Sequence, residues 1–352
     1  MKNLRISSLV GAALVAGSVM TATTVVPGAA TAAEVEGPSV KWLAGLWGIR
    51  RGMTEGVEYL SAQAKEKTDG AFDISLQYGG ALAGQFEVLE GIESGAFEVG
   101  VVCTTFSVGK LPLLSGLELP FIPADTIEKR RALQEAYMAQ PEIVSELEKW
   151  NAVALASVLL PNYQVMGRGK PPVALADYDG LRLNSTGQVA EAMRLLGVSV
   201  SSSPTTDLYQ AMERGVIDGM VYPFTGPFFS NKWNEIAEWY TTNLSPGSAV
   251  CFVLANKDAY DSLPDQYKGL LADLRSGALD ANIAEYKKED DVNLPILAED
   301  GVQPITYTAE ELAGLREMGG QPIWTAWAEA REAEGLPGDR MLEMILTDNY
   351  GN

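Results

Sequence analysis

Glu213-Arg214-Gly215-Val216-Ile217-Asp218 repeats the pattern of Glu93-Ser94-Gly95-Ala96-Phe97-Glu98, which lies 120 residues earlier in the chain. In both stretches a glycine follows the last turn of a predicted helix, where glycine commonly ends a helix. The chain then turns at once into a predicted strand. A match over only six positions is meaningful because the predicted elements around the two stretches also come in the same order.

The predicted elements around the two stretches come in the same order. Hydrophobic spacing predicts strands at residues 40–44, 72–78 and 97–102, with helices at 54–67 and 86–94 between them. The second set has strands at 181–184, 198–202 and 216–222, with helices at 188–196 and 206–214. A β-α-β-α-β unit used twice predicts an α/β protein with two lobes, each a mostly parallel sheet flanked by helices. Because ligands bind outside the carboxyl ends of parallel strands, we expect a ligand cleft between the lobes that closes by hinge motion.

The rest of the chain extends this two-lobed plan. A helix is predicted at 126–150, interrupted near Pro141, and strands at 151–160 and 249–254 would cross between the lobes. A long helix follows at 263–294, and Thr308 with Glu311 forms a capping box that opens the final helices. We assign residues 34–157 and 247–285 to lobe I and residues 158–246 and 286–352 to lobe II.

Composition favours binding over catalysis. The 352 residues are 47% hydrophobic, enough for a packed core, and 46 Asp and Glu against 26 Lys and Arg give a net charge of −20. Such an acidic surface repels phosphate backbones, so nucleic acid is not an expected partner. The absence of histidine excludes Ser-His-Asp and Cys-His catalysis and His-ligated zinc, and two cysteines are too few for a Cys-rich zinc site. No phosphate-binding glycine loop is present, so we expect no cofactor and no metal.

The first 33 residues have the pattern of a secretory signal peptide. Lys2 and Arg5 precede an apolar stretch at 9–20, and small residues at 30–33 resemble a cleavage site. Removing the two positive charges leaves 24 against 46, a net charge of −22 for the mature chain. No later stretch is apolar over about 18 residues, so we expect an exported, periplasmic chain that does not insert into the membrane.

Several segments resemble the receptors of TRAP transporters, the DctP family. They are Gly79–Gly84 with Glu87–Glu90, Leu117–Phe121, Leu175–Arg182, Leu208–Met212 and Gly215–Gly219, in order along nearly the whole mature chain. The resemblance implies a bilobed, type II periplasmic-binding-protein fold with a long helix spanning both lobes. It also implies a monomeric receptor without catalytic activity that binds a small solute and works with two integral-membrane TRAP subunits.

The chain departs from the family where the family binds carboxylates. Most members open the second lobe with Gly-Leu-Lys-hydrophobic-Arg, and that arginine grips the ligand. Here the same register places Arg182 on the lysine and Asn184 on the arginine. Alternation along a strand keeps Arg182 on the face of Asn184, so it could still lean towards the cleft. Tyr222 replaces an asparagine that touches ligand in the family, and Gln164, next to Tyr163, replaces a second arginine.

These replacements change the expected ligand. A neutral asparagine cannot replace the charge of a bidentate arginine, whereas aromatic faces suit a cation or an apolar body. The candidate ligand-binding residues are therefore polar and aromatic, and the ligand they favour is an amine, an amino alcohol or a zwitterionic compatible solute. The candidates are Trp42, Trp47, Tyr163, Gln164, Arg182, Asn184, Tyr222 and Phe224. Core packing is the competing interpretation for each aromatic residue, Trp42 above all.

Two functional alternatives stay open. The first is a receptor for an organic acid that uses Arg182 or Arg168, and the second is an exported hydrolase that depends on carboxylates. Cys103 and Cys251 fall on predicted strands of the first lobe. In an oxidising compartment they would form a disulfide, and the alternative is two buried thiols.

Overall fold

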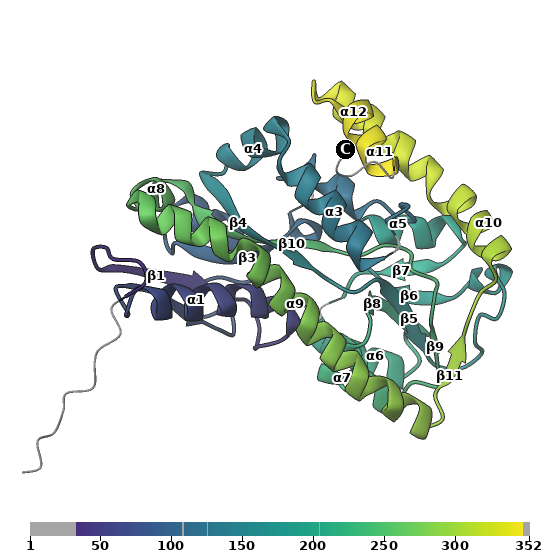
Figure 1. Cartoon of the computed structure of the whole chain (residues 1–352). Coiled ribbons are helices and arrows are strands. Elements are labelled where there is room, and N and C mark those ends of the chain that lie inside the picture. The colour runs from purple at the N-terminus through teal and green to yellow at the C-terminus, as the bar shows by residue number, and fades with distance from the viewer. Residues whose placement is uncertain (1–32, 108, 125, 204, 348–352) are drawn as a thin grey trace, which may run out of the picture. The chain divides into compact units, whose positions relative to one another are not determined.

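The computed structural model describes residues 33–107, 109–124, 126–203 and 205–347. The predicted signal peptide, except for Ala33, lies outside the described residues. Within the described part of the chain, the elements form two β-sheets, each covered by helices (Figure 1). No helix in that part is both long enough and apolar enough to span a bilayer.

The first sheet belongs to lobe I and has the strand order β2-β1-β3-β10-β4. Its strands are β1 (Val40–Gly45), β2 (Phe72–Gln77), β3 (Val99–Cys103), β4 (Ala152–Leu159) and β10 (Val250–Asn256). Strands β2, β1 and β3 pair in parallel, and only β10 runs against its neighbours. Helices α1 (Glu55–Lys67) and α2 (Val88–Glu93) connect these parallel strands, as the repeated unit predicts.

The second sheet belongs to lobe II and has the order β11-β9-β5-β8-β6-β7. Its strands are β5 (Tyr163–Gly167), β6 (Arg182–Asn184), β7 (Ser199–Ser201), β8 (Gly219–Pro223), β9 (Trp239–Thr241) and β11 (Gln303–Ile305). Here β5 is the strand that runs against its neighbours β8 and β9. This lobe also contains helices α5 (Gly187–Leu195), α6 (Leu208–Glu213) and α7 (Gly226–Ser230). In each sheet the reversed strand is the one that follows a crossing from the other lobe, and the prediction of two mostly parallel sheets is confirmed.

The chain crosses between the lobes along two neighbouring segments. Residues 160–162 join β4 to β5, and residues 242–249 join β9 to β10. The Tyr163 N–H donates to the Gly247 carbonyl at 2.9 Å, and the Ser248 hydroxyl donates to the Leu160 carbonyl at 3.3 Å. These bonds hold the two crossing segments side by side.

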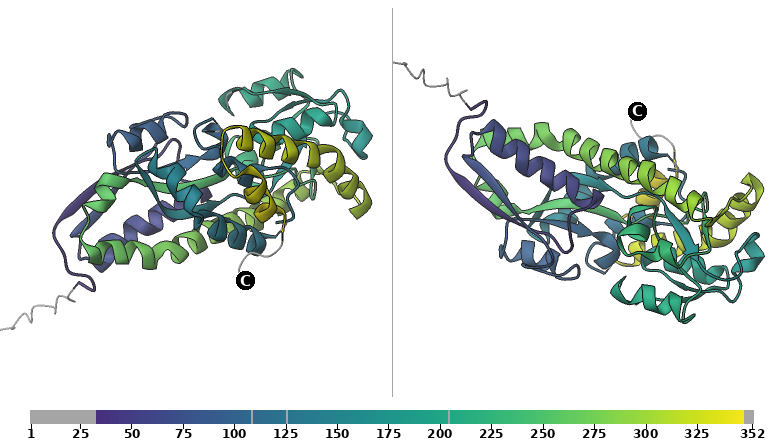
Figure 2. Two further views of the ribbon diagram at one scale, coloured as in Figure 1. Left: turned by 90° about the horizontal axis from the view of Figure 1, so that it is seen from above. Right: turned by 90° about the horizontal axis from the view of Figure 1, so that it is seen from below.

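Helix α9 (Asp265–Glu299) is the third connection between the lobes. It packs against α1 and β4 of the first lobe and against α7 of the second, and Figures 1 and 2 show it as a long green helix beside α1. Asn282 donates to the Gly52 carbonyl at 2.7 Å and accepts from the Leu159 N–H at 2.9 Å. Further along, Asp290 accepts from both the N–H and the hydroxyl of Thr225, at 3.1 and 2.9 Å. One helix is therefore bonded to both lobes.

Six helices remain to be placed, three in lobe I and three near the C-terminal end of the described chain. They are α3 (Ile127–Met138), α4 (Pro141–Glu148), α8 (Lys257–Asp261), α10 (Ala309–Gly319), α11 (Gln321–Ala333) and α12 (Gly338–Leu346). The break at Pro141 and the capping box of Thr308 and Glu311 are both present. The segment 286–352 contacts both lobes. The Tyr307 hydroxyl bonds with Tyr178 of lobe II at 2.9 Å, while the Trp327 indole donates to Ser115 of lobe I at 3.0 Å and Arg340 pairs with Glu142 of lobe I at 2.5 Å.

A disulfide links two strands in the core of lobe I. Cys103 on β3 and Cys251 on β10 lie directly opposite each other in the ladder, with their Cα atoms 4.0 Å apart, and they are bonded. Of the two interpretations left open by the sequence, the disulfide is the one found. It lies next to the 3-10 turn Thr104–Phe106, where β3 ends at the carboxyl edge of the sheet.

Candidate functional site

The carboxyl ends of β1, β3, β6 and β8 carry the residues that the sequence singles out. Asn184 is the last residue of β6, and its side chain is completely buried. Its Oδ1 lies 3.5 Å from the Tyr222 hydroxyl, and its Nδ2 has no hydrogen-bond partner among the described residues. The hydroxyls of neighbouring Ser185 and Ser201 lack partners there as well. Because a buried polar group without a partner is costly, this cluster points to a bound solute that would satisfy it.

Aromatic rings surround that cluster on the side of lobe II. Tyr222, half-buried near the end of β8, lies parallel to Tyr163 with ring centres 6.4 Å apart. Its ring also meets Trp233 edge-on at 5.0 Å, and Thr205 bonds its hydroxyl. Phe224 stacks on Tyr240 at 5.4 Å. The structure thus brings Tyr163, Asn184 and Tyr222 together, as the strand register predicts.

Lobe I contributes Trp47, two residues beyond the end of β1. The Trp47 indole N–H donates to the Val101 carbonyl at 3.0 Å, which fixes the ring across the end of the sheet. Phe106 meets this ring edge-on at 5.3 Å, and the Arg51 guanidinium lies over it, 4.6 Å from the ring centre. Since Trp47 is half-buried, part of it stays accessible.

The sequence analysis missed Glu118, a buried carboxylate at this junction. Oε1 accepts hydrogen bonds from the Thr104 hydroxyl and from the Val250 N–H, while Oε2 has no partner among the described residues. Burial raises the pKa of Glu118 to about 7. Across the junction, Gly187 opens α5 at φ +60°, and a Cβ there would lie 3.3 Å from Oε2 of Glu118. The signal in the sequence was an acid enclosed by apolar residues in Leu117–Phe121.

Two predicted site residues have structural roles instead. Trp42 is only 4% exposed, and its ring packs edge-on against Phe72 at 5.1 Å, so the core interpretation holds for it. Gln164 is buried with its amide fully used: Oε1 accepts from the Thr241 hydroxyl at 2.8 Å and from the Leu244 N–H at 3.1 Å, and Nε2 donates to Ser245 at 3.1 Å. It fastens the crossing segment before β10.

The two candidate arginines lie at the opposite end of the second sheet. Arg182 begins β6 and grips Asp218 through its side chain, with Nε to Oδ2 at 3.0 Å, and it also donates to the Gly215 carbonyl at 2.8 Å. Arg168 pairs with Glu238 at 3.1 Å. Tyr222 lies three residues further along β8 than Gly219, which is about 10 Å at the rise of a strand. Neither arginine joins the cluster around Asn184.

The chemistry of these side chains is that of a binding site. Among the described residues, no group of three or more His, Cys, Asp or Glu side chains is arranged to hold a metal ion. Both cysteines are used in the disulfide. What remains at the junction is aromatic surface, unpartnered amide and hydroxyl groups, and one buried carboxylate.

Comparison with known proteins agrees with this geometry. The monocarboxylate 2-oxoacid-binding periplasmic protein of Nostoc sp. is 24% identical over 297 residues, which cover 80% of this chain and 78% of that protein. The ectoine-binding periplasmic protein TeaA of Halomonas elongata is 21% identical over 278 residues, covering 76% and 78%. A marine metagenome TRAP solute binding protein, solved with 3-hydroxybenzoate, superposes with a TM-score of 0.75 at 22% identity, covering 90% of this chain and all of that one.

The structural likeness confirms the bilobed fold. The family model described as bacterial extracellular solute-binding protein, family 7, matches residues 44–330 of this chain. That match spans both sheets, α9 and most of α11. The chain therefore belongs to the DctP family of TRAP solute-binding proteins.

Proposed function

We propose that this protein is the periplasmic receptor of a TRAP importer for a small polar organic solute that carries a positive charge. The solute class is an amine, an amino alcohol or a zwitterionic compatible solute. The observation that carries the proposal is the neutral Asn184, fully buried with an amide nitrogen that has no partner among the described residues. The resemblance places it at the position of the family's carboxylate-binding arginine. The receptor works as a monomer and delivers its solute to the membrane subunits of the importer.

The surroundings of Asn184 support a cationic group. The rings of Tyr222 and Tyr163 lie parallel to each other beside Asn184, and an alkylammonium over an aromatic face gains about 0.5–2 kcal/mol. The unpartnered Oε2 of Glu118 adds a negative charge at the same junction when its carboxyl is ionised. The net charge of −22 predicted for the mature chain adds a field that attracts cations from a distance.

The names of relatives support two classes of ligand. TeaA is named for ectoine, whereas the Nostoc protein is named for monocarboxylate 2-oxoacids and the metagenome protein was solved with an aromatic acid. An organic-acid receptor is therefore the second candidate. Arg182 and Arg168 give it no support, because both are engaged with Asp218 and Glu238 at the far end of the sheet. A hydrolase has no support from the family.

Thermal-shift screening of the purified protein tests the proposal. One arm contains choline, ethanolamine, glycine betaine and ectoine, and the other contains succinate, pyruvate and 3-hydroxybenzoate. We expect stabilisation in the first arm, with calorimetry giving the affinity. A response only to anions that lack a cationic group would overturn the proposal.

Asn184→Arg provides the sharper test, because it would restore the family's cation beside the bound solute. We expect it to weaken a cation-bearing solute by about tenfold or more, through like-charge repulsion, while Asn184→Gln serves as the neutral control of similar polarity. Unliganded melting curves show that each variant is folded. Unaltered affinity in a folded Asn184→Arg protein would remove this residue from the site.

A further inference from the structure

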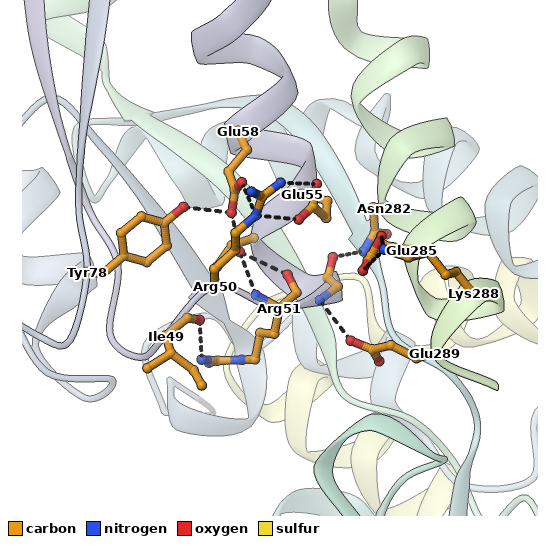
Figure 3. Close-up of polar contacts among 12 residues, drawn as sticks. Ile49, Arg50, Arg51, Glu55, Glu58, Tyr78, Asn282, Glu285, Lys288 and Glu289 are labelled. Carbon is orange, nitrogen blue, oxygen red and sulfur yellow. Dashed lines mark hydrogen bonds and ion pairs between the residues drawn. The ribbon is translucent and has the colours of Figure 1, made fainter. Parts of the chain in front are cut away.

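A pocket of about 430 Å³ lies where the β1–α1 connection faces α7 and α9. Six charged residues line it: Arg50, Arg51, Glu55, Glu285, Lys288 and Glu289. Figure 3 shows Glu289 from α9 on one side of Arg51, whose guanidinium extends to the other side, towards Ile49. Its volume falls in the usual range for a small-molecule site.

Four of the six charges neutralise one another. Arg50 pairs with Glu55 at 3.0 Å and also reaches Glu58 at 2.6 Å, and Lys288 pairs with Glu285 at 2.9 Å. Their side chains are bonded within their own element or to the adjoining one (Figure 3). These pairs leave Arg51 and Glu289 as the charges of the pocket that lack an ion pair among the described residues.

Arg51 is a half-buried cation that forms no ion pair among the described residues. One of its N–H groups donates to the Ile49 carbonyl at 3.0 Å, and the guanidinium covers the Trp47 ring. A guanidinium has five N–H donors, so most of its hydrogen-bonding capacity remains open. Burial lowers the pKa of Arg51, and the opposing effects of Tyr286 and Glu289 do not cancel this.

Glu289 is the complementary case. Its Oε1 accepts one long hydrogen bond, 3.4 Å from the Gly52 N–H, and its Oε2 is buried without a partner among the described residues. Burial raises the pKa of Glu289, and the opposing effects of the Gly52 N–H and Lys288 do not cancel this. The Oε2 atom faces Gly226, where a Cβ would lie 2.3 Å away, so it points towards the start of α7.

The pocket borders chain segments that carry residues of the candidate site. Arg51 lies on the ring of Trp47, which closes the site on the side of lobe I. Glu289 faces Gly226, two residues after Phe224, and the adjacent Asp290 holds the Thr225 between them. Arg51 and Glu289 therefore lie next to chain segments that carry two aromatic residues of the candidate site, Trp47 and Phe224.

We propose that Arg51 and Glu289 bind the two charged ends of a zwitterionic solute, Arg51 its carboxylate and Glu289 its cationic group. The inference rests on the proposed function and narrows its ligand class. A zwitterion is complementary to a pocket with one unpaired guanidinium and one unpaired carboxylate, because binding it neutralises both buried charges at once. Arg51 thereby takes over the role that Asn184 cannot perform.

Calorimetry with three isosteric probes tests this. Glycine betaine carries both charges, choline carries the cation alone, and 3,3-dimethylbutyrate has the shape of betaine with the carboxylate alone. We expect the native protein to prefer betaine, or ectoine as a second zwitterion, over both singly charged probes. If choline binds and neither zwitterion does, this inference fails while the proposed function stands. If only 3,3-dimethylbutyrate binds, the proposed function fails as well.

Two variants assign the charges. Arg51→Gln should weaken the zwitterion by about tenfold to a hundredfold, the range for a charged hydrogen-bonded contact, and leave choline unaffected. Glu289→Gln should weaken both the zwitterion and choline. Arg194→Gln is the control, since Arg194 is an exposed arginine on α5 that is paired with Glu191 and does not line the pocket, and it should bind like the native protein. Equal losses for zwitterion and choline in Arg51→Gln, or native affinity in either test variant, would overturn the assignment.

Discussion

Glu118 makes stability depend on pH in a direction opposite to most carboxylates. Burial holds its pKa at about 7, above its ordinary value of 4.5, so the native state keeps a proton that the unfolded chain has lost. Stability from this group is fully present below pH 4.5 and falls as the pH rises through 7. The loss is about 3 kcal/mol, from a shift of roughly two and a half pKa units.

Glu118→Gln isolates this effect. The amide oxygen of glutamine accepts the same hydrogen bonds from Thr104 and Val250, but the side chain does not titrate. Urea unfolding between pH 4.5 and 8 should show the variant gaining about 3 kcal/mol relative to the native protein as the pH rises. Parallel curves for the two proteins would mean that Glu118 is ionised across the whole range.

Tyr222 acts on the solute through its ring. Its hydroxyl is bonded to Thr205 and lies 3.5 Å from Asn184, at the long limit of a hydrogen bond, so it is already engaged within lobe II. Tyr222→Phe should therefore keep most of the affinity, and Tyr222→Ala should lose about 1–3 kcal/mol, as for other aromatic anchors. Calorimetry on both variants decides this, and native affinity in Tyr222→Ala would place the residue outside the site.

Individual residues of the site could be predicted where the strand register alone determines their position. Asn184 and Tyr222 end adjacent parallel strands, so their meeting follows from the repeated unit. Arg182 shows the limit of this reasoning, because alternation gives its face of the strand but not its partner Asp218. Arg51 and Glu289 come together only when α9 packs beside the β1–α1 connection, a contact that no local pattern contains.

The disulfide joins two strands that already pair in the sheet. Cys103 and Cys251 are separated by 148 residues, so in the chain-entropy account the bond restricts a long loop in the unfolded state. Replacing both with serine should lower the free energy of unfolding by about 2–5 kcal/mol. Dithiothreitol should destabilise the native protein to the same extent and leave the double variant unchanged. A native protein insensitive to the reductant after full thiol titration would contradict this.

The order of elements in the two repeated units was predicted correctly, while strand starts were displaced and β5, β9 and β11 were not predicted. The sequence predicts strands from Phe97 and Val216, but β3 begins at Val99 and β8 at Gly219. After each helix-ending glycine the chain stays bonded to the helix for a short distance, as the Val216 N–H does to the Ala211 carbonyl. Val216 is 62% exposed in that turn. Apolar residues in a tight turn have the same local pattern as the strand they precede, so periodicity alone cannot separate them.

Three connections between the lobes constrain how they move. The crossing segments are bonded to each other through Tyr163 with Gly247 and Ser248 with Leu160. Helix α9 is fastened to lobe I at Asn282 and to lobe II at Asp290. The sequence predicted that strands at 151–160 and 249–254 cross between the lobes, whereas the crossings are the segments 160–162 and 242–249 beside those strands. The repeated units do not predict whether α9 bends between Asn282 and Asp290.

Solute binding should bring the lobes together about these connections. A solute that contacts Trp47 of lobe I and Tyr222 of lobe II gains contacts to both only when they approach, so its binding free energy favours the closer arrangement. In α9 the change falls on the segment between Asn282 and Asp290, because hydrogen bonds fix the helix to a different lobe on each side. Small-angle scattering should show a smaller radius of gyration at saturating solute, and Tyr222→Ala at the same solute concentration should retain the larger value. An unchanged radius in the saturated native protein would mean that the lobes are held at one separation and that the solute enters without hinge motion.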